Sequence, residues 1–180
     1  TVGVFDGDRN RVRVQPTNLG VMIARSMMAR TGADLAIMNA GGVRDSLPEG
    51  KVTYRDVLKV QPFGNQLSLV RLSGAELTKY LEAVAKMTPG SGAFPQTVGV
   101  QMVIEGGVLK EARVQGRPIE PQREYRLALN NFTAGGGDGY PKLSDHPGHV
   151  NTGLVDADVM RAFITAGSPL KAADFAPVAT

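Results

Sequence analysis

Three segments of alternating apolar residues lie at 98–104, 108–114 and 125–129, and the turns between them contain Gly106-Gly107 and Gln115-Gly116. Alternation with a period of two is typical of strands, and tight turns that contain glycine indicate hairpins. We therefore expect a three-stranded antiparallel run here. Hairpins require antiparallel neighbours, so this feature favours a mixed fold over a purely parallel, doubly wound sheet.

Helices with clear capping signals surround these strands. Thr17 can cap a helix over 18–30 that Gly32 ends, and Ser73 with Glu76 forms a capping box for an amphipathic helix to about 87. The other expected elements are a buried strand at 35–38, a short helix at 54–58 opened by Thr53 and Asp56, a strand around 67–70, and a last helix capped by Asp156 that runs to about 166. The sequence thus predicts one α+β domain, a mixed layered arrangement of helices packed on mostly antiparallel or mixed sheets.

The composition suits a single globular domain with a proper core. Of the 180 residues, 42% are hydrophobic and 21% are charged. The net charge of +3 is scattered among acids, so the long basic tract of a nucleic-acid-binding protein is missing. We expect no membrane span and no signal peptide in these residues, and without cysteine there is no thiolate metal site or disulfide. The start at Thr1 rather than at Met suggests a processed product or an excised piece.

Two phenylalanines stand in glycine-rich polar loops far apart in the chain. Phe63 lies in QPFGNQ and Phe132 in NNFTAGGGDGY, and neither has the apolar neighbours of a buried strand. Two such rings suit a flat aromatic ligand, since stacking a base on one aromatic side chain contributes roughly 1–3 kcal/mol. Asn65 could hydrogen-bond the edge of that base. The alternatives are rings that fold inward and an ordinary turn asparagine.

The segment from Arg9 to Arg13 offers cations for a phosphate group. Arg9 and Arg13 share a face in a helix and in a strand, whereas Arg11 joins them only if the segment is extended. The direction of the Arg11 side chain therefore reports the local conformation. Guanidinium groups bind phosphate oxygens in a bidentate manner. The alternative is a solvated basic edge.

Two glycine-rich turns each carry one further charged residue that could contact a ligand. Gly41 and Gly42 precede Arg44 just past an expected strand, where a backbone without side chains lets a ligand approach. Asp138 sits among four glycines, which would expose its carboxylate to the hydroxyl groups of a ribose. A simple strand-to-loop turn and a common Asp-Gly turn are the alternatives.

Groups that could activate water are missing from the sequence. His146 and His149 share one proline-glycine loop with Asp145, and no second cluster supplies the ligands of a hydrolytic metal pair. There is no GxSxG elbow and no cysteine nucleophile. We therefore expect ligand binding without hydrolysis.

Four motifs, taken together and in order, resemble the C-terminal domain of the bacterial 5′-nucleotidases, most of all the periplasmic enzymes that hydrolyse UDP-sugars and 5′-nucleotides. They are NAGGVRDS from Asn39, VQPFGN from Val60, SGAFPQ from Ser91 and NNFTAGGGDGY from Asn130. In that family the domain binds substrate: two phenylalanines sandwich the base, an asparagine and a glycine lie beside it, an aspartate holds the ribose and arginines hold the phosphates. The resemblance assigns these roles to Phe63, Phe132, Asn65, Gly92, Asp138, Arg9, Arg13 and Arg44.

The resemblance also implies parts that lie outside these 180 residues. Family members carry a preceding metallophosphoesterase domain with two divalent metal ions, so we expect no cofactor in this chain and a nucleotide or nucleoside as its ligand. The location implied is periplasmic or secreted. Two departures are Val43, where isoleucine or leucine is commoner, and Gly135, a third glycine that would loosen the Phe132 loop. The alternatives are a free-standing nucleotide-binding or sensing module and the same domain from a cyclic-nucleotide phosphodiesterase.

Overall fold

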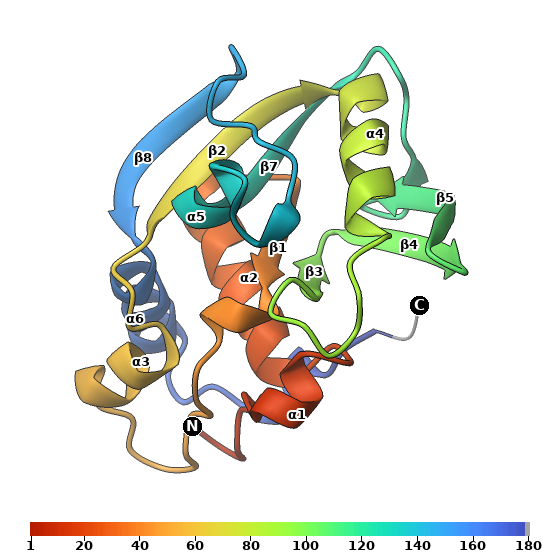
Figure 1. Ribbon diagram of the computed structural model, residues 1–180. Coiled ribbons are helices and arrows are strands. Elements are labelled where there is room, and N and C mark those ends of the chain that lie inside the picture. Colours follow the sequence, from red (N-terminus) through yellow and green to blue (C-terminus); the bar gives the residue numbers. More distant parts are fainter. Residues whose placement is uncertain (179–180) are drawn as a thin grey trace.

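A five-stranded sheet of mixed direction forms the centre of the fold (Figure 1). The computed structural model describes residues 1–178. Only β1 and β7 run parallel, and every other neighbouring pair is antiparallel. In spatial order the strands are β3 (Pro95–Val98), β1 (Leu35–Asn39), β7 (Glu124–Asn130), β2 (Gln66–Ser73) and β8 (His149–Val155). The predicted α+β class is confirmed.

A second, three-stranded sheet corrects one prediction. The expected hairpin is present as β4 (Val100–Glu105) and β5 (Val108–Val114), but its third strand is the short β6 (Arg117–Pro118). The segment at 125–129, expected in this run, instead forms β7 at the centre of the main sheet. Its residues Leu127 and Leu129 are fully buried, so they need a cover that a small exposed sheet does not provide.

The helices largely follow their capping signals. Thr17 caps the second helix, Gly32 ends it with a positive φ of 71°, and both capping boxes form as predicted. Asp156, expected as a cap, is instead the first residue of the last helix, after Val155 at the N-cap. The helices are α1 (Arg9–Val12), α2 (Asn18–Thr31), α3 (Tyr54–Val60), α4 (Gly74–Val84), α5 (Asn131–Ala134) and α6 (Asp156–Gly167), with short 3-10 turns η1 (Ala40–Gly42), η2 (Gly137–Gly139) and η3 (Ala172–Phe175).

Both faces of the main sheet are covered, which makes a layered domain (Figure 1). Ala36 and Met38 of β1 point into a core shared with α2 and α6. Leu35 and Ile37 point the other way, into a core with α4 and the second sheet. Because successive side chains of a strand alternate between faces, a strand between two cores is apolar throughout. None of the helices in residues 1–178 is long and apolar enough to cross a membrane.

Four loops that carry six of the eight expected site residues meet at one edge of the main sheet. The carboxyl ends of β1 and β7 lie side by side, since these strands are parallel, and lead into loops at Asn39 and Asn130. β2 and β3 run in the opposite direction, so the loops that precede them arrive at the same edge. Leu67 of β2 pairs with Asn130, and Pro95 of β3 pairs with Asn39. Residues distant in the sequence are therefore neighbours here.

Candidate ligand-binding site

A cavity of about 470 Å³ opens where these loops meet. Seven of the eight residues expected at the site line it, and Arg9 does not. Asn39 and the two glycines of η1 also contribute to its wall. The lining residues are Arg13, Asn39, Gly41, Gly42, Arg44, Phe63, Asn65, Gly92, Phe132 and Asp138.

The two phenylalanine rings are exposed rather than folded into the core. Phe63 is 58% exposed and Phe132 is 46% exposed, although both line the same cavity. The Phe132 ring lies against the backbone of Gly137, where an added Cβ would be only 2.6 Å from the tip of the ring. The guanidinium carbon of Arg44 lies 5.7 Å from the centre of the Phe63 ring, within the range of a cation–π contact. Exposed apolar rings at a cavity are typical of a surface that binds an aromatic ligand.

Asp138 is held at the wall of the cavity in an unusual backbone conformation. Its φ is +57°, a backbone angle that residues other than glycine rarely adopt. Its Oδ2 accepts a hydrogen bond from Nδ2 of Asn39 at 2.9 Å. Nearby, the N–H of Gly41 donates to the carbonyl oxygen of Gly92 at 2.8 Å. A Cβ on either glycine would lie 3.6 Å from the Asp138 carboxylate. The absence of side chains at these positions therefore keeps that carboxylate accessible.

The arginines form a cationic group close to the cavity. Burial lowers the pKa of Arg13, and the positive charges of Arg9 and Arg44 lower it further. None of the three forms an ion pair with a carboxylate of the residues that the structure describes. Cations gathered without partners favour the binding of an anion, which relieves their mutual repulsion. Arg9 thus acts on the site through its charge while lying outside the cavity lining.

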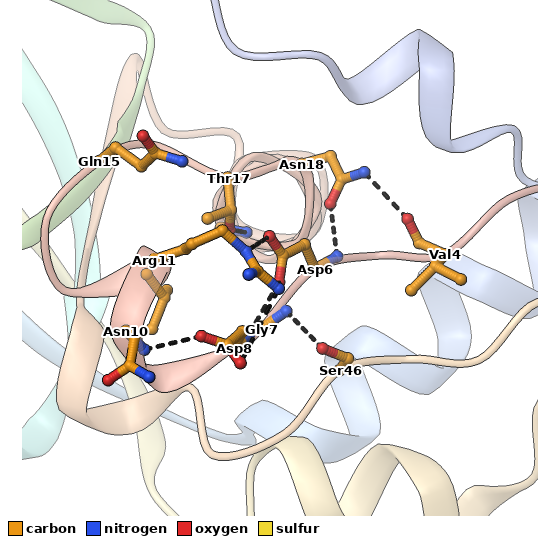
Figure 2. Close-up of polar contacts among 12 residues, drawn as sticks. Val4, Asp6, Gly7, Asp8, Asn10, Arg11, Gln15, Thr17, Asn18 and Ser46 are labelled. Atoms are coloured by element: carbon orange, nitrogen blue, oxygen red, sulfur yellow. Dashed lines mark hydrogen bonds and ion pairs between the residues drawn. The ribbon is translucent and has the colours of Figure 1, made fainter.

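The direction of Arg11 answers the question that the sequence left open. Arg11 is not among the residues that line the cavity, and it pairs with Asp6, with 2.6 Å between Nε and Oδ2 (Figure 2). This pairing follows from the helical conformation of α1, and it lowers the pKa of the Asp6 carboxyl. The N–H of Asp6 in turn donates to Oδ1 of Asn18 at the start of α2. These contacts fix the segment that carries Arg9 and Arg13.

The two histidines belong to separate structural contacts. Nε2 of His146 lies 2.6 Å from Oε2 of Glu76, in the capping box of α4. Nε2 of His149, in the strand β8 that sequence analysis missed, lies 2.9 Å from Oγ of Ser68. Across residues 1–178, no group of three or more metal-ligating side chains gathers at one point. The residues present do not fit a metal ion.

One contact missed by sequence analysis ties the site to α6. The N–H of Asp156, the first residue of α6, donates to the carbonyl oxygen of Asn65 at 2.8 Å. The Asp156 carboxyl is buried and accepts from the N–H of Ala157 at 2.7 Å. An acidic residue at the start of a helix was the only sequence signal for it. The base of the Phe63 loop is thereby anchored to a rigid helix.

Replacing Asp156 by asparagine is expected to stabilise the domain at neutral pH and to have no effect near pH 3. Burial raises the pKa of this carboxyl from 3.8 to about 6. A raised pKa means that the folded state holds the proton more tightly, so the contribution of Asp156 to stability is fully present below pH 3.8 and is lost as the pH rises through about 6. Asparagine removes this penalty, an effect on the order of 2 kcal/mol, and keeps an acceptor for Ala157. Thermal unfolding at several pH values measures it, with the exposed Asp145→Asn as control. A gain that is independent of pH would contradict the assignment.

Residues 1–145 match the family described as 5′-nucleotidase, C-terminal domain. The chain is 49% identical over 175 residues to the silent protein UshA(0) of Salmonella typhimurium, covering 97% of this chain and 32% of the relative. It is 48% identical to the protein UshA of Escherichia coli, with 98% and 32% covered. A 5′-nucleotidase of Vibrio cholerae is 49% identical, with 97% and 32% covered. The chain thus spans about a third of the length of these relatives.

Solved structures give the same result. A 5′-nucleotidase precursor from Thermus thermophilus superimposes with a TM-score of 0.81 at 32% identity, over 91% of this chain and 35% of that one. The NAD nucleotidase of Haemophilus influenzae gives a TM-score of 0.78 at 27% identity, over 92% and 34%. Sequence and fold agree over nearly the whole chain, which therefore belongs to the family of 5′-nucleotidase C-terminal domains.

Proposed function

We propose that this domain binds the nucleoside part of a nucleotide and presents its phosphate to a hydrolytic domain of the same polypeptide. One observation carries the proposal: two exposed aromatic rings from distant loops line one cavity together with a carboxylate and two arginines. A base held between Phe63 and Phe132 would gain stacking energy on both faces, toward the upper end of roughly 1–3 kcal/mol per stacking side chain. Such a clamp tolerates different bases.

Different polar side chains contact the ribose, the edge of the base and the phosphate of the proposed ligand. Asp138 accepts hydrogen bonds from the ribose hydroxyls, and Asn65 donates to or accepts from the edge of the base. Arg13 and Arg44 hold phosphate oxygens, and Arg9 adds its positive charge from just outside the cavity. Gly92 offers a backbone that the base can approach closely. By resemblance to the family, we include UDP-sugars among the candidate substrates.

The chemistry of phosphate release is assigned to the part of the relatives that this chain does not match. Two divalent metal ions bound there would supply an activated water and polarise the phosphoryl group. The residues described here instead contribute binding and orientation, which lower the barrier by placing the reacting groups together. By resemblance to the family, we propose that the full protein works in the periplasm or outside the cell. The threefold greater length of the relatives favours this division of labour over a free-standing sensing module.

The Arg13→Gln substitution is expected to weaken the binding of AMP about tenfold and to leave the binding of adenosine nearly unchanged. A charge-assisted hydrogen bond to phosphate is worth about 1.5–3 kcal/mol, and adenosine has no phosphate to lose. Titrations of the chain with both ligands, followed by calorimetry or NMR, measure the two affinities. Arg30→Gln is the control, because Arg30 is an exposed arginine in the last turn of α2 and lies outside the cavity lining.

Two outcomes of these experiments would overturn the proposal. One is equal weakening of AMP and adenosine by Arg13→Gln, which would place the arginine away from the phosphate. The other is phosphate release from AMP by this chain with added Mn²⁺ or Zn²⁺, at a rate well above background. The second result would put the catalytic groups in these residues.

A further inference from the structure

A chain of buried hydrogen bonds runs from α5 to the carboxylate at the cavity wall. The N–H and Oγ1 of Thr133 donate to Oδ1 of Asn130 at 2.8 and 3.1 Å. Nδ2 of Asn130 donates to Oδ1 of Asn39 at 3.1 Å, and Nδ2 of Asn39 donates to Oδ2 of Asp138 at 2.9 Å. Asn130 and Thr133 are each 1% exposed and Asn39 is 3% exposed. We call these two asparagines, with Thr133 and Asp138 at the ends, the amide relay.

The direction of the amide relay is fixed by its two ends. The backbone N–H of Thr133 can only donate, so the oxygen of the Asn130 amide must face it. The amino group of Asn130 then faces Asn39 and needs an acceptor there. The carboxylate of Asp138 can only accept, so the amino group of Asn39 must face it. Every donor meets an acceptor in one orientation of both amides, and reversing either amide would break two contacts.

The relay compensates for a weakness of the loop that carries Asp138. The three residues before it are glycines, which contribute no side chain to hold the loop in place. Asp138 also has a φ of +57°, a left-handed conformation that costs free energy for an L-residue and therefore needs support from its surroundings. Among the described residues, the only hydrogen bond recorded for its carboxylate is the one from Asn39. The direction of this carboxylate thus depends on a neighbour that Asn130 in turn orients.

We propose that Asn130 is a positioning residue that sets the direction of the Asp138 carboxylate through Asn39 and so determines selectivity for ligands with vicinal hydroxyl groups. Asn130 does not line the cavity and caps α5, on which Phe132 lies two residues further on. One buried amide therefore positions both the ring that stacks on the base and the acid that faces the sugar. The inference rests on the proposed role of Asp138 in binding the ribose.

Two substitutions break the relay and keep the helix cap. Asn130→Ser retains an oxygen that can accept from the N–H of Thr133, since serine is a good N-cap, but it is too short to reach Asn39. Asn130→Asp has nearly the shape of asparagine but can only accept. The amino group of Asn39 would then turn toward the new carboxylate and present its oxygen to Asp138, which repels that acid.

The readout is the ratio of affinities for adenosine and 2′,3′-dideoxyadenosine, which differ only in the two hydroxyls. In the unchanged chain, adenosine should bind about tenfold more tightly or better, as expected for hydrogen bonds to a charged acceptor. In both Asn130 variants this ratio should fall toward one, while the affinity for dideoxyadenosine stays the same. A merely structural role would weaken both ligands equally, and that result would overturn the inference.

Controls separate the inference from the proposed function. Ser73→Ala removes the N-cap of α4, which packs in the core away from the cavity, and must leave the ratio unchanged at a similar loss of thermal stability. An unchanged chain without preference for adenosine would overturn both the role of Asp138 and the relay. A normal preference that survives in both variants would overturn the relay alone. If neither variant folds, hydrogen exchange of the side-chain amides in the unchanged chain decides: exchange of Asn130 as fast as that of the exposed Asn10 would overturn the relay, and strong protection would support it.

Discussion

Removing both rings, in the Phe63→Ala/Phe132→Ala variant, is expected to abolish measurable binding of adenosine and AMP. Each ring contributes roughly 1–3 kcal/mol of stacking, so the loss of both lowers the affinity by roughly 30-fold to more than 10⁴-fold. Calorimetric or NMR titration of the chain measures this loss. The single variants should each show a partial loss, because one face of the base remains stacked.

Because the two rings are exposed, their removal should change ligand affinity without a large change in the stability of the domain. Both side chains are about half exposed, so their truncation should change the free energy of unfolding by only about 0.5 kcal/mol each. Val103→Ala/Val108→Ala, at exposed positions of the β4–β5 hairpin, is a control that removes exposed apolar surface outside the cavity lining. Full affinity in the double phenylalanine variant would refute the stacking of a base between the rings.

The second large effect is expected from Gly137→Ala, which adds one methyl group and leaves both rings in the sequence. The new Cβ would lie 2.6–2.7 Å from three atoms of the Phe132 ring, closer than real contacts allow. The Phe132 ring must therefore move away from its position against Gly137. We expect the affinity for adenosine to fall at least about tenfold, because one stacking face is lost. The same titrations measure this effect.

A neighbouring glycine supplies the control for this substitution. In Gly135→Ala the Cβ would lie 3.2 Å from the carbonyl oxygen of Asn131, a contact that a small adjustment relieves, and the φ of −81° suits any residue. Adenosine binding should therefore persist. This variant also tests the prediction that the third glycine loosens the Phe132 loop, since alanine there would reduce that freedom. Equal losses of adenosine affinity in Gly135→Ala and Gly137→Ala would contradict the proposed importance of the Phe132 ring position against Gly137.

Local signals in the sequence predicted the helices well, whereas strand pairing required information that no local pattern contains. Thr17 and the capping boxes act within three or four residues, so their effect can be read directly. The segment at 125–129 alternates like the strands before it, yet it pairs with β1 and β2. Which sheet a strand joins depends on contacts with distant residues, and this is why the third strand of the predicted antiparallel run was wrong and β8 was missed.

The sequence predicted most residues that line the candidate site, but not the buried asparagines whose hydrogen bonds support its wall. Phe63 and Phe132 could be recognised because exposed rings in polar loops have no structural explanation in the sequence. Asn39 and Asn130 had no such mark, since their partnership joins residues 91 positions apart. The signal available was that each asparagine is the last residue of a strand that points at the site. The place of Arg9 outside the cavity lining also depends on tertiary geometry.

The parallel alignment of β1 with β7 has a consequence for how the protein matures. The wall residues of the cavity come from positions 13 to 138, and the segments that follow β1 and β7 lie together because these two central strands are aligned in parallel. A chain that lacks this alignment lacks these adjacent wall segments, so under the proposed function a nucleotide would bind only the fully folded form. Under the proposed function, a bound nucleotide would therefore stabilise the fully folded domain by its binding free energy and would not stabilise forms that lack the cavity.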